Sequence, residues 1–347
     1  MFTACFVITE KCNLDCDYCY MNNCDIFMQP EVFDFHYEKT LPQFMKHYGE
    51  DKYYLDLFGG EPCLNWGLVD HIVKKVRGDE NLEAVRLMTN GLLIDETHAL
   101  FIKQNNIKLS LSFDGLWAKN LKQYKNKKKL FKMIVNDCSV CVTPQNMNMA
   151  DNYKFLIDEF NLVPKFKIVR DNIWSDEDVG LFKSELDKLE EVYFDYLREG
   201  NNLIPKLFEH RLLMLIEGTI HKMDKMRCFV GKNGVAFSPL GKVYPCARFM
   251  TSDFLPLFDG KKILEENLKL IDEFANKFSN ECKKCEISEC CDHICLQQEF
   301  LNQGVIKNVC EIYKLVTNKV IRINHKLKEN DIWTSYVKNK YRGIMNG

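Results

Sequence analysis

The stretch FTACFVITEKCNLDCDYC, residues 2–19, joins an apolar run to three cysteines, and it decides the fold. The run at 2–9 has the length and the branched and aromatic side chains of a buried strand. Cysteines spaced C-x3-C-x2-C follow its carboxyl end. Parallel α/β folds gather their active sites at that edge. The order of strand and cysteines therefore predicts a site at the carboxyl edge of a parallel sheet.

Five more β-rich runs follow along the chain. They are YYLDLF (53–58), AVRLMT (84–89), IKLSLSF (107–113), CSVCVT (138–143) and KFKIVR (165–170). Segments with helical spacing separate them, as at 66–76 and 97–104. This alternation predicts parallel βαβ units with right-handed crossovers, which fit either an open doubly wound sheet or an incomplete barrel. One rim would also carry the turns GGEP (59–62), TNG (89–91) and FDG (113–115).

The composition is that of an ordinary soluble protein, with 347 residues, 46% apolar residues and a formal net charge of −2. The length suits one large α/β domain with a smaller appendage. The charge gives no reason to expect nucleic acid or an anionic membrane as partner. No run approaches the roughly eighteen apolar residues of a membrane span, and no signal peptide is recognisable. We therefore expect a cytoplasmic protein.

The pattern changes after about residue 172. Helical spacing marks three further segments, at 175–198, 206–223 and 311–327. Between them, GVAF and KVYP flank SPLG (238–241), which predicts a hairpin with Gly241 in its turn. From Cys228 the chain is rich in loops and cysteines and has little apolar core of its own. We predict a barrel with bridging helices at 1–222, a cysteine-rich domain at 223–310 and a helical segment at 311–347.

The chain has 16 cysteines, with three at 12–19 and six at 282–310. In a reducing cytosol, clustered cysteines bind metal more often than they form disulfides. Three thiolates without a nearby histidine can hold three corners of a cubane cluster and leave one iron without a protein ligand. A tetrahedral zinc site would need a fourth ligand. The first cysteine motif therefore favours an iron–sulfur cluster with one open iron.

The C-x3-C-x2-C motif, with Tyr18 before its last cysteine, resembles the signature of the radical S-adenosylmethionine (AdoMet, SAM) superfamily. The resemblance implies a 4Fe–4S cluster on Cys12, Cys16 and Cys19, whose open iron binds the methionyl amine and carboxylate of AdoMet. One electron, from a donor of the flavodoxin or ferredoxin type, would cleave AdoMet. The resulting 5′-deoxyadenosyl radical abstracts a hydrogen from the substrate.

The turns on the same rim resemble the AdoMet-binding motifs of that superfamily. Two glycines would let backbone come close to the ligand, and Glu61 would offer its carboxylate to the methionyl ammonium. The implied AdoMet contacts are Tyr18, Gly59, Gly60, Glu61, Pro62, Asn90 and Ser112. The implied fold is a partial (β/α)6 barrel of the TIM type. Nothing in the sequence identifies a catalytic base or hydrogen donor, and Asp114 could be purely structural.

The later cysteines resemble the SPASM extension of radical AdoMet enzymes, which holds up to two auxiliary 4Fe–4S clusters. One cluster would be closed by Cys282, Cys285, Cys291 and Cys310. The other would be held by Cys228, Cys246 and Cys295, with Cys290, a distant cysteine or an open iron completing it. Zinc is an alternative because His293 lies inside the array. The remaining cysteines are assigned to core or surface: Cys5, Cys24, Cys63, Cys138 and Cys141.

The resemblance implies an AdoMet-dependent oxidoreductase that matures a ribosomally synthesised peptide through a thioether or carbon–carbon crosslink. The alternatives are a peptide epimerase, an enzyme acting on a small molecule or protein side chain, and a non-catalytic metal or electron-transfer module. Sulfatase-maturing relatives carry an Asp where this chain has Ala247, which disfavours that activity. Met1 lies close to the first strand, so we expect no leader-binding winged domain. Recognition would then come from the barrel rim, from the helices after residue 172 or from a separate leader-recognition protein.

Overall fold

The computed structural model describes residues 1–171, 173–217, 230–275, 282, 284–287, 291, 295–301 and 307–329. Within these ranges the strands form one eight-stranded sheet in the order β6-β5-β4-β3-β2-β1-β7-β8. The strands are β1 (Phe2–Thr9), β2 (Tyr53–Gly59), β3 (Leu82–Thr89), β4 (Lys108–Ser112), β5 (Val135–Val142), β6 (Pro164–Ile168), β7 (Gly234–Phe237) and β8 (Val243–Tyr244). All neighbouring pairs are parallel except β7 with β8.

The α/β architecture and the order of the six predicted strands are confirmed. The SPLG hairpin is also present, with Gly241 at a φ of 81° in its turn. Sequence periodicity did not predict that β7 pairs in parallel with β1, in register from Thr3 with Gly234 to Phe6 with Phe237. The sheet therefore continues across the predicted boundary at residue 222, and the division into three parts stays a prediction.

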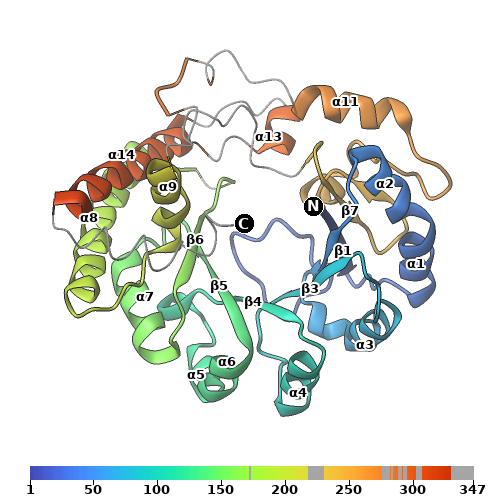
Figure 1. The fold of residues 1–347 in the computed structure, drawn as a ribbon, viewed down its shortest axis with the longest axis horizontal. Helices are drawn as coiled ribbons and strands as arrows, with labels where there is room; N and C mark the ends of the chain where they lie inside the picture. The colour runs from blue at the N-terminus through green and yellow to red at the C-terminus, as the bar shows by residue number, and fades with distance from the viewer. Residues whose placement is uncertain are drawn as a thin grey trace.

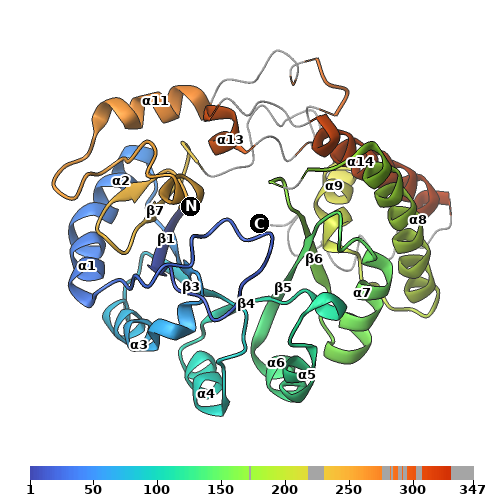
Figure 2. The same cartoon turned by 180° about the vertical axis from the view of Figure 1, so that it is seen from behind.

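The helices surround the curved sheet, and most of them lie on its outer side (Figures 1 and 2). They are α1 (Pro30–Phe35), α2 (Leu41–Tyr48), α3 (Trp66–Lys75), α4 (Glu96–Gln104), α5 (Leu121–Asn126), α6 (Lys128–Ile134), α7 (Met149–Phe155), α8 (Asp176–Arg198), α9 (Lys206–Glu217), α10 (Ala247–Thr251), α11 (Glu265–Ala275), α13 (Leu296–Phe300) and α14 (Lys307–Glu329). Single turns of π-helix or 3-10 helix are η1 (His36–Thr40), η2 (Pro62–Asn65), η3 (Gly115–Trp117) and η4 (Leu156–Phe160). No helix among the described residues is long and apolar enough to cross a membrane.

The two faces of the sheet differ in chemistry. Phe6 of β1 packs on the outer side, with its ring 4.8 Å from that of Phe33 in α1 and 4.3 Å from that of Phe237 in β7. Successive side chains of a strand point to opposite faces, so the residue before Phe6 points inward. Four residues share that inner face through the strand registers: Cys5, Asp56, Arg86 and Lys108. The outer face thus packs into the apolar core, and the inner face carries these polar side chains beside apolar ones such as Val7 and Phe58.

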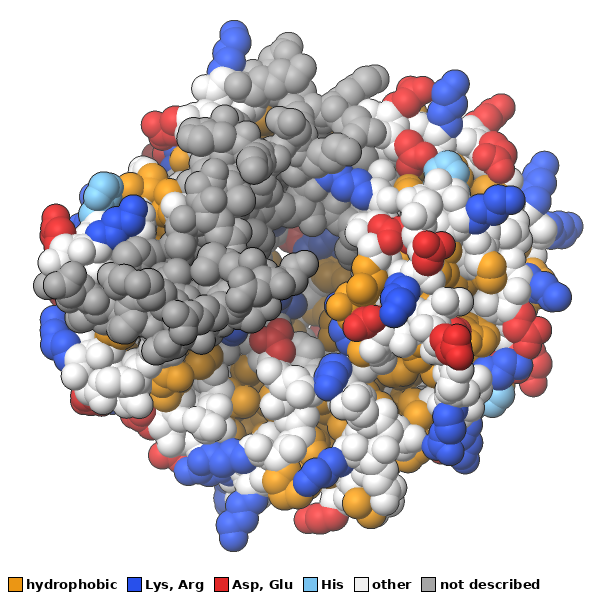
Figure 3. Space-filling view, viewed as in Figure 1, with side chains coloured by type: hydrophobic (Ala, Val, Ile, Leu, Met, Phe, Trp, Pro, Cys, Tyr) orange, Lys and Arg blue, Asp and Glu red, His pale blue; other side chains and the backbone are white. Residues whose placement is uncertain are grey.

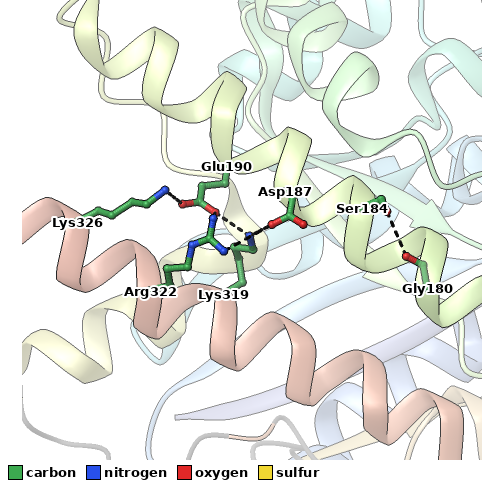
Figure 4. A network of polar contacts seen from close by, with 7 residues as sticks. All are labelled: Gly180, Ser184, Asp187, Glu190, Lys319, Arg322 and Lys326. Carbon is green, nitrogen blue, oxygen red and sulfur yellow. Dashed lines mark hydrogen bonds and ion pairs between the residues drawn. The ribbon is translucent and has the colours of Figure 1, made fainter.

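The carboxyl-terminal helix α14 is fixed to α8 by a network of ion pairs (Figure 4). Lys319, only 7% exposed, places its Nζ 2.7 Å from Oε2 of Glu190 and also donates to Asp187. Lys326 Nζ lies 2.5 Å from the other oxygen of Glu190. Burial by itself would raise the pKa of Glu190, but the two lysines hold it below its ordinary value. The network fixes the position of α14, and Cys310 lies in the first turn of this helix.

Acidic and basic side chains are interspersed over the face of the molecule drawn in Figure 3, around a hollow near its centre. This distribution agrees with a formal net charge of −2.

Candidate active site

A cavity of about 560 Å³ opens at the carboxyl edge of the sheet. Its wall is built from the segments that follow the first five strands. The lining includes the three cysteines Cys12, Cys16 and Cys19, together with Gly59, Asn90 and Ser112. The predicted rim is therefore a single site, because parallel strands bring their carboxyl ends together.

The loop between β1 and α1, residues 10–29, is closed at its base by hydrogen bonds. The hydroxyl of Thr9 donates to the carbonyl of Ile26 at 2.9 Å, and the amide of Met28 donates to the carbonyl of Ile8 at 2.9 Å. The loop is thus held at both ends, and its cysteines are presented over the end of β1. We call residues 10–29 the cluster loop.

Backbone and side-chain hydrogen bonds place the three thiols within the cluster loop. The amide of Cys12 donates to Oδ1 of Asn23 at 2.8 Å, and the amide of Leu14 donates to the Cys12 sulfur at 3.4 Å. The amide of Cys19 donates to the carbonyl of Cys16 at 2.9 Å. Burial raises the pKa of Cys12 and Cys16, and the neighbouring thiols of the motif raise it further. The three sulfurs therefore lie within electrostatic reach of one another.

The donor set fits an iron–sulfur cluster better than a single metal ion. Among the described residues, no three His, Cys, Asp or Glu side chains converge closely enough to hold one ion. A zinc ion would need its thiolates at about 2.3 Å from one point. In a cubane each thiolate binds a different iron, so the sulfurs stand farther apart around a shared volume. Three thiols lining one cavity match that requirement.

The GGEP turn packs against the cluster loop through its backbone. The amide of Gly60 donates to the carbonyl of Thr9 at 2.9 Å, and the amide of Glu61 donates to the carbonyl of Lys11 at 2.8 Å. A Cβ on Gly59, whose φ is 147°, would lie 2.0 Å from the Thr9 oxygen, and one on Gly60 would lie 2.3 Å from the Lys11 oxygen. The glycines are thus required by the contact between two turns, in addition to lining the cavity.

Glu61 has a different position from the one expected. Its carboxylate is fully buried and accepts hydrogen bonds from the Cys63 amide at 2.9 Å, the Thr89 hydroxyl at 2.6 Å and the Asn90 amide at 2.8 Å. Burial raises the pKa of the Glu61 carboxyl, and the hydrogen bonds from these donors offset only part of the rise. Neither Glu61 nor Pro62 is part of the cavity lining. The carboxylate ties the GGEP turn to the TNG turn, and the AdoMet contacts expected of Glu61 and Pro62 stay predictions.

Tyr18 ties the cluster loop to the FDG turn. Its hydroxyl donates to Oδ2 of Asp114, and the other carboxylate oxygen accepts the amide of Cys141 at 3.1 Å. The carbonyl of Asp114 accepts from Nδ2 of Asn152 at 2.9 Å, and a Cβ on Gly115 would collide with the same amide group. Burial raises the pKa of Asp114 above its ordinary value. Asp114 is thus a positioning residue within the cavity wall.

Sequence reasoning missed three asparagines that assemble the site. Asn23 holds Cys12, Asn152 holds the FDG turn, and Asn13 accepts a hydrogen bond from Nδ2 of Asn90 at 2.8 Å. Asn13 and Asn23 lie inside the cluster loop, where loop composition alone explains an asparagine. Asn152 lies far along the chain in α7. No spacing signal could have identified them, since each role depends on a contact between separate turns.

Part of the carboxyl-terminal cysteine array lies among the described residues. Burial, followed by the thiols of Cys291, Cys282 and Cys285, raises the pKa of Cys310 to about 11. These four cysteines are the ones predicted to share a cluster, and that assignment stays a prediction. The predicted ligand Cys228, with Cys290 and His293, lies outside the described residues.

Comparison with known families matches residues 6–136 to the radical SAM superfamily. The radical SAM cyclopropyl synthase TigE of Paramaledivibacter caminithermalis is 22% identical, over 94% of this chain and 75% of its own. The cysteine-type anaerobic sulfatase-maturating enzyme of Clostridium novyi is 25% identical, over 90% of this chain and 93% of its own. The matched segment contains the cluster loop and the three turns of the cavity.

Solved structures share the fold. Native anSMEcpe with bound AdoMet is 18% identical, with a TM-score of 0.71 over 94% of this chain and 99% of its own. SuiB of Streptococcus suis bound to the precursor peptide SuiA is 14% identical, with a TM-score of 0.57 over 88% of this chain and 74% of its own. The family match over residues 6–136 supports a radical SAM enzyme, and these solved structures show that the fold is shared.

Proposed function

We propose that this chain, which carries a radical SAM domain at residues 6–136, is a radical SAM/SPASM maturase of a ribosomally synthesised peptide. A single observation carries the proposal. The three thiols of the cluster loop and the GGEP, TNG and FDG turns line one cavity at the carboxyl edge of the sheet. When bound there, the 4Fe–4S cluster and AdoMet supply a 5′-deoxyadenosyl radical for hydrogen abstraction from the substrate.

The chain's own residues bind, orient and exclude water. Cys12, Cys16 and Cys19 would hold the cluster, and the backbone of Gly59 and Gly60 with the side chains of Asn90 and Ser112 would contact AdoMet. Tyr18 would add its ring to the same wall while its hydroxyl holds the FDG turn in place. Apolar side chains, among them Phe58, Met88, Trp117 and Tyr124, line the same cavity and limit its access to water.

The proposed bond is a thioether or a carbon–carbon crosslink within a peptide. Two solved structures of the same fold contain peptides: anSMEcpe with the Kp18Cys peptide, and SuiB with its precursor peptide SuiA. On the inner face of the sheet, Arg86 forms a bidentate ion pair with the buried Asp56, and Lys108 is the register partner of Arg86. At the start of α10, Ala247 is buried and offers only a methyl group, which supports crosslinking over sulfatase maturation.

The remaining parts of the proposal concern architecture and partners. We infer a partial (β/α)6 barrel followed by a SPASM region. In that region Cys282, Cys285, Cys291 and Cys310 would hold one auxiliary 4Fe–4S cluster, and Cys246 and Cys295 would take part in the other. The effect of the thiols of Cys291, Cys282 and Cys285 on the pKa of Cys310 supports the first assignment. A flavodoxin or ferredoxin would supply electrons, and a separate protein would recognise the leader peptide.

The experiment is reconstitution with a precursor peptide encoded by a short reading frame beside this gene. Anaerobically loaded protein, AdoMet and a low-potential reductant should remove two hydrogen atoms from the peptide for each crosslink formed, as read by mass spectrometry. Unchanged peptide mass with deuterium uptake from the solvent would show an epimerase instead. Absence of 5′-deoxyadenosine above a control without protein would show a non-catalytic module.

A further inference from the structure

Strands β5 and β6 direct a row of polar side chains toward the inner side of the sheet. Ser112 of β4 lines the cavity, and its register partner on β5 is Ser139, whose own partner on β6 is Lys165. Because register partners point to the same face of a sheet, these three side chains share the face that the cavity occupies. Alternation adds Cys141 and Lys167, which are partners one step closer to the carboxyl edge. The inner wall therefore continues from the cavity across β5 to the end strand β6.

The opposite side of β6 agrees with this orientation. Phe166 is 4% exposed and Ile168 is 8% exposed, so the residues that alternate with the lysines belong to the apolar core. Lys165 and Lys167 are both exposed. One face of β6 is thus apolar and the other basic, as the alternation of side chains along a strand requires.

Lys165 and Lys167 have no acidic partner among the described residues. Neither ammonium forms an ion pair or a hydrogen bond there, although Asp137 lies two residues before Ser139 on the same face of β5. Desolvation lowers the pKa of Lys167, and the like charge of Lys165 lowers it further. Solvent thus reaches the Lys167 side chain, yet the surrounding protein displaces part of the hydration of its ammonium. Both properties together are those of a charge inside a hollow.

The hydroxyl of Ser139, on the strand between the lysines and Ser112, also lacks a partner. Ser139 is 5% exposed, and its Oγ has no hydrogen-bond partner among the described residues. Buried hydroxyls are nearly always paired with protein or with ordered water. A ligand oxygen, bound directly or through one water, would complete the hydrogen bonding of this group. The same stretch of wall therefore offers two positive charges and one unsatisfied hydroxyl.

We infer that Lys165 and Lys167 form a subsite for a carboxylate of the substrate peptide. The inference deepens the proposed function and rests on it. An ammonium donates charge-assisted hydrogen bonds to a carboxylate. Two strand spacings of ~4.8 Å separate β6 from β4, so the anchored carboxylate would lie within a few residues of the one to be modified. The substrate is then a peptide with a carboxylate close to its modified residue, either on an acidic side chain or at the peptide's carboxyl terminus.

The test measures crosslinking of the precursor peptide by the anaerobically reconstituted full-length chain. Lys167→Met removes the charge at similar volume, and Lys167→Arg keeps the charge. The control is Lys154→Met in α7, an exposed lysine that also forms no ion pair among the described residues. Loss of a charge-assisted pair should raise the KM of Lys167→Met about 10- to 100-fold, with a smaller change in kcat. Lys167→Arg should raise the KM much less, and Lys154→Met should not change it.

Variants of the peptide identify the source of the carboxylate and need no change in the protein. Each acidic side chain of the peptide is replaced in turn by its amide, and a further peptide carries a carboxyl-terminal amide. The peptide that lacks the anchoring carboxylate should have a raised KM with the natural chain and no further increase with Lys167→Met. If no peptide variant changes the KM of the natural chain, or if Lys167→Met leaves it unchanged, the inference is overturned while the proposed function stands. Absence of any crosslinking by the natural chain would overturn both.

Discussion

At the scale of single residues, the site depends on backbone contacts that tolerate no side chain. Gly59→Ala would place a methyl group 2.0 Å from the Thr9 carbonyl at a φ of 147°. We expect it to lower the free energy of unfolding by about 3 kcal/mol or more. Urea unfolding of the apoprotein measures the change. The control is Gly180→Ala in helix α8, where no atom lies within 4 Å of an added Cβ. We expect this change to raise the free energy of unfolding by roughly 0.5 kcal/mol. If both substitutions changed the free energy of unfolding by similar amounts, the close contact between Gly59 and the Thr9 carbonyl would be contradicted.

His36 makes stability depend on pH. Its ring is buried among Phe35, Phe237 and Phe258, and Nδ1 lies 3.1 Å from the Thr40 hydroxyl. Burial lowers the pKa of His36 from 6.5 to about 4. The unfolded chain therefore binds more protons between these values, so the stabilisation present above pH 6.5 is lost as the pH falls toward 4.

The expected loss from His36 is at most about 3 kcal/mol across this window. Chemical unfolding at a series of pH values gives the free energy of unfolding as a function of pH. Between pH 6.5 and 4 this free energy should fall less steeply for His36→Phe than for the natural chain. Equal slopes would mean that the histidine is charged, or equally accessible, in both folded and unfolded states.

The sequence predicted which residues line the cavity, but it did not predict which contacts their side chains make. The three cysteines and the glycine turns were predicted together on one rim, because strand order and motif order coincide. Glu61 and Asp114 were identified as motif residues, but their carboxylates face other turns of the protein. Such roles depend on which turns meet in space, and no local pattern encodes that.

At the scale of elements, the buried ion pairs between α8 and α14 set how firmly α14 is held. Glu190→Gln would leave Lys319 with Asp187 as its remaining carboxylate partner at 7% exposure. We expect a loss of about 3 kcal/mol in the free energy of unfolding. Asp195→Asn, which removes an exposed pair with Arg198 on α8, should cost less than about 1 kcal/mol. Equal costs would show that the network does not hold the helix.

Element prediction succeeded where local patterning was strong. The first strand has its predicted bounds of Phe2–Thr9, and Ser175 caps α8 at the predicted start. The parallel pairing of β7 with β1 was not predicted, because it joins residues more than 200 positions apart.

At the scale of the whole molecule, the curved sheet presents a cavity at the carboxyl ends of its strands, within the segment that matches the radical SAM superfamily. At the β7–β8 end, Cys246 lies two residues beyond the last strand, at the start of α10. The cluster loop lies between these regions, since Tyr20, directly after Cys19, contacts Arg248 of α10. Hydrogen abstraction and electron handling would therefore take place in one connected part of the protein.

The central claim is that the cluster loop generates a radical from AdoMet, and 5′-deoxyadenosine formation tests it most directly. Anaerobically reconstituted natural chain, with AdoMet and a low-potential reductant, should release 5′-deoxyadenosine. Cys16→Ala should release none above the control without protein, while auxiliary iron is retained. Release by Cys16→Ala at the rate of the natural chain would contradict the account.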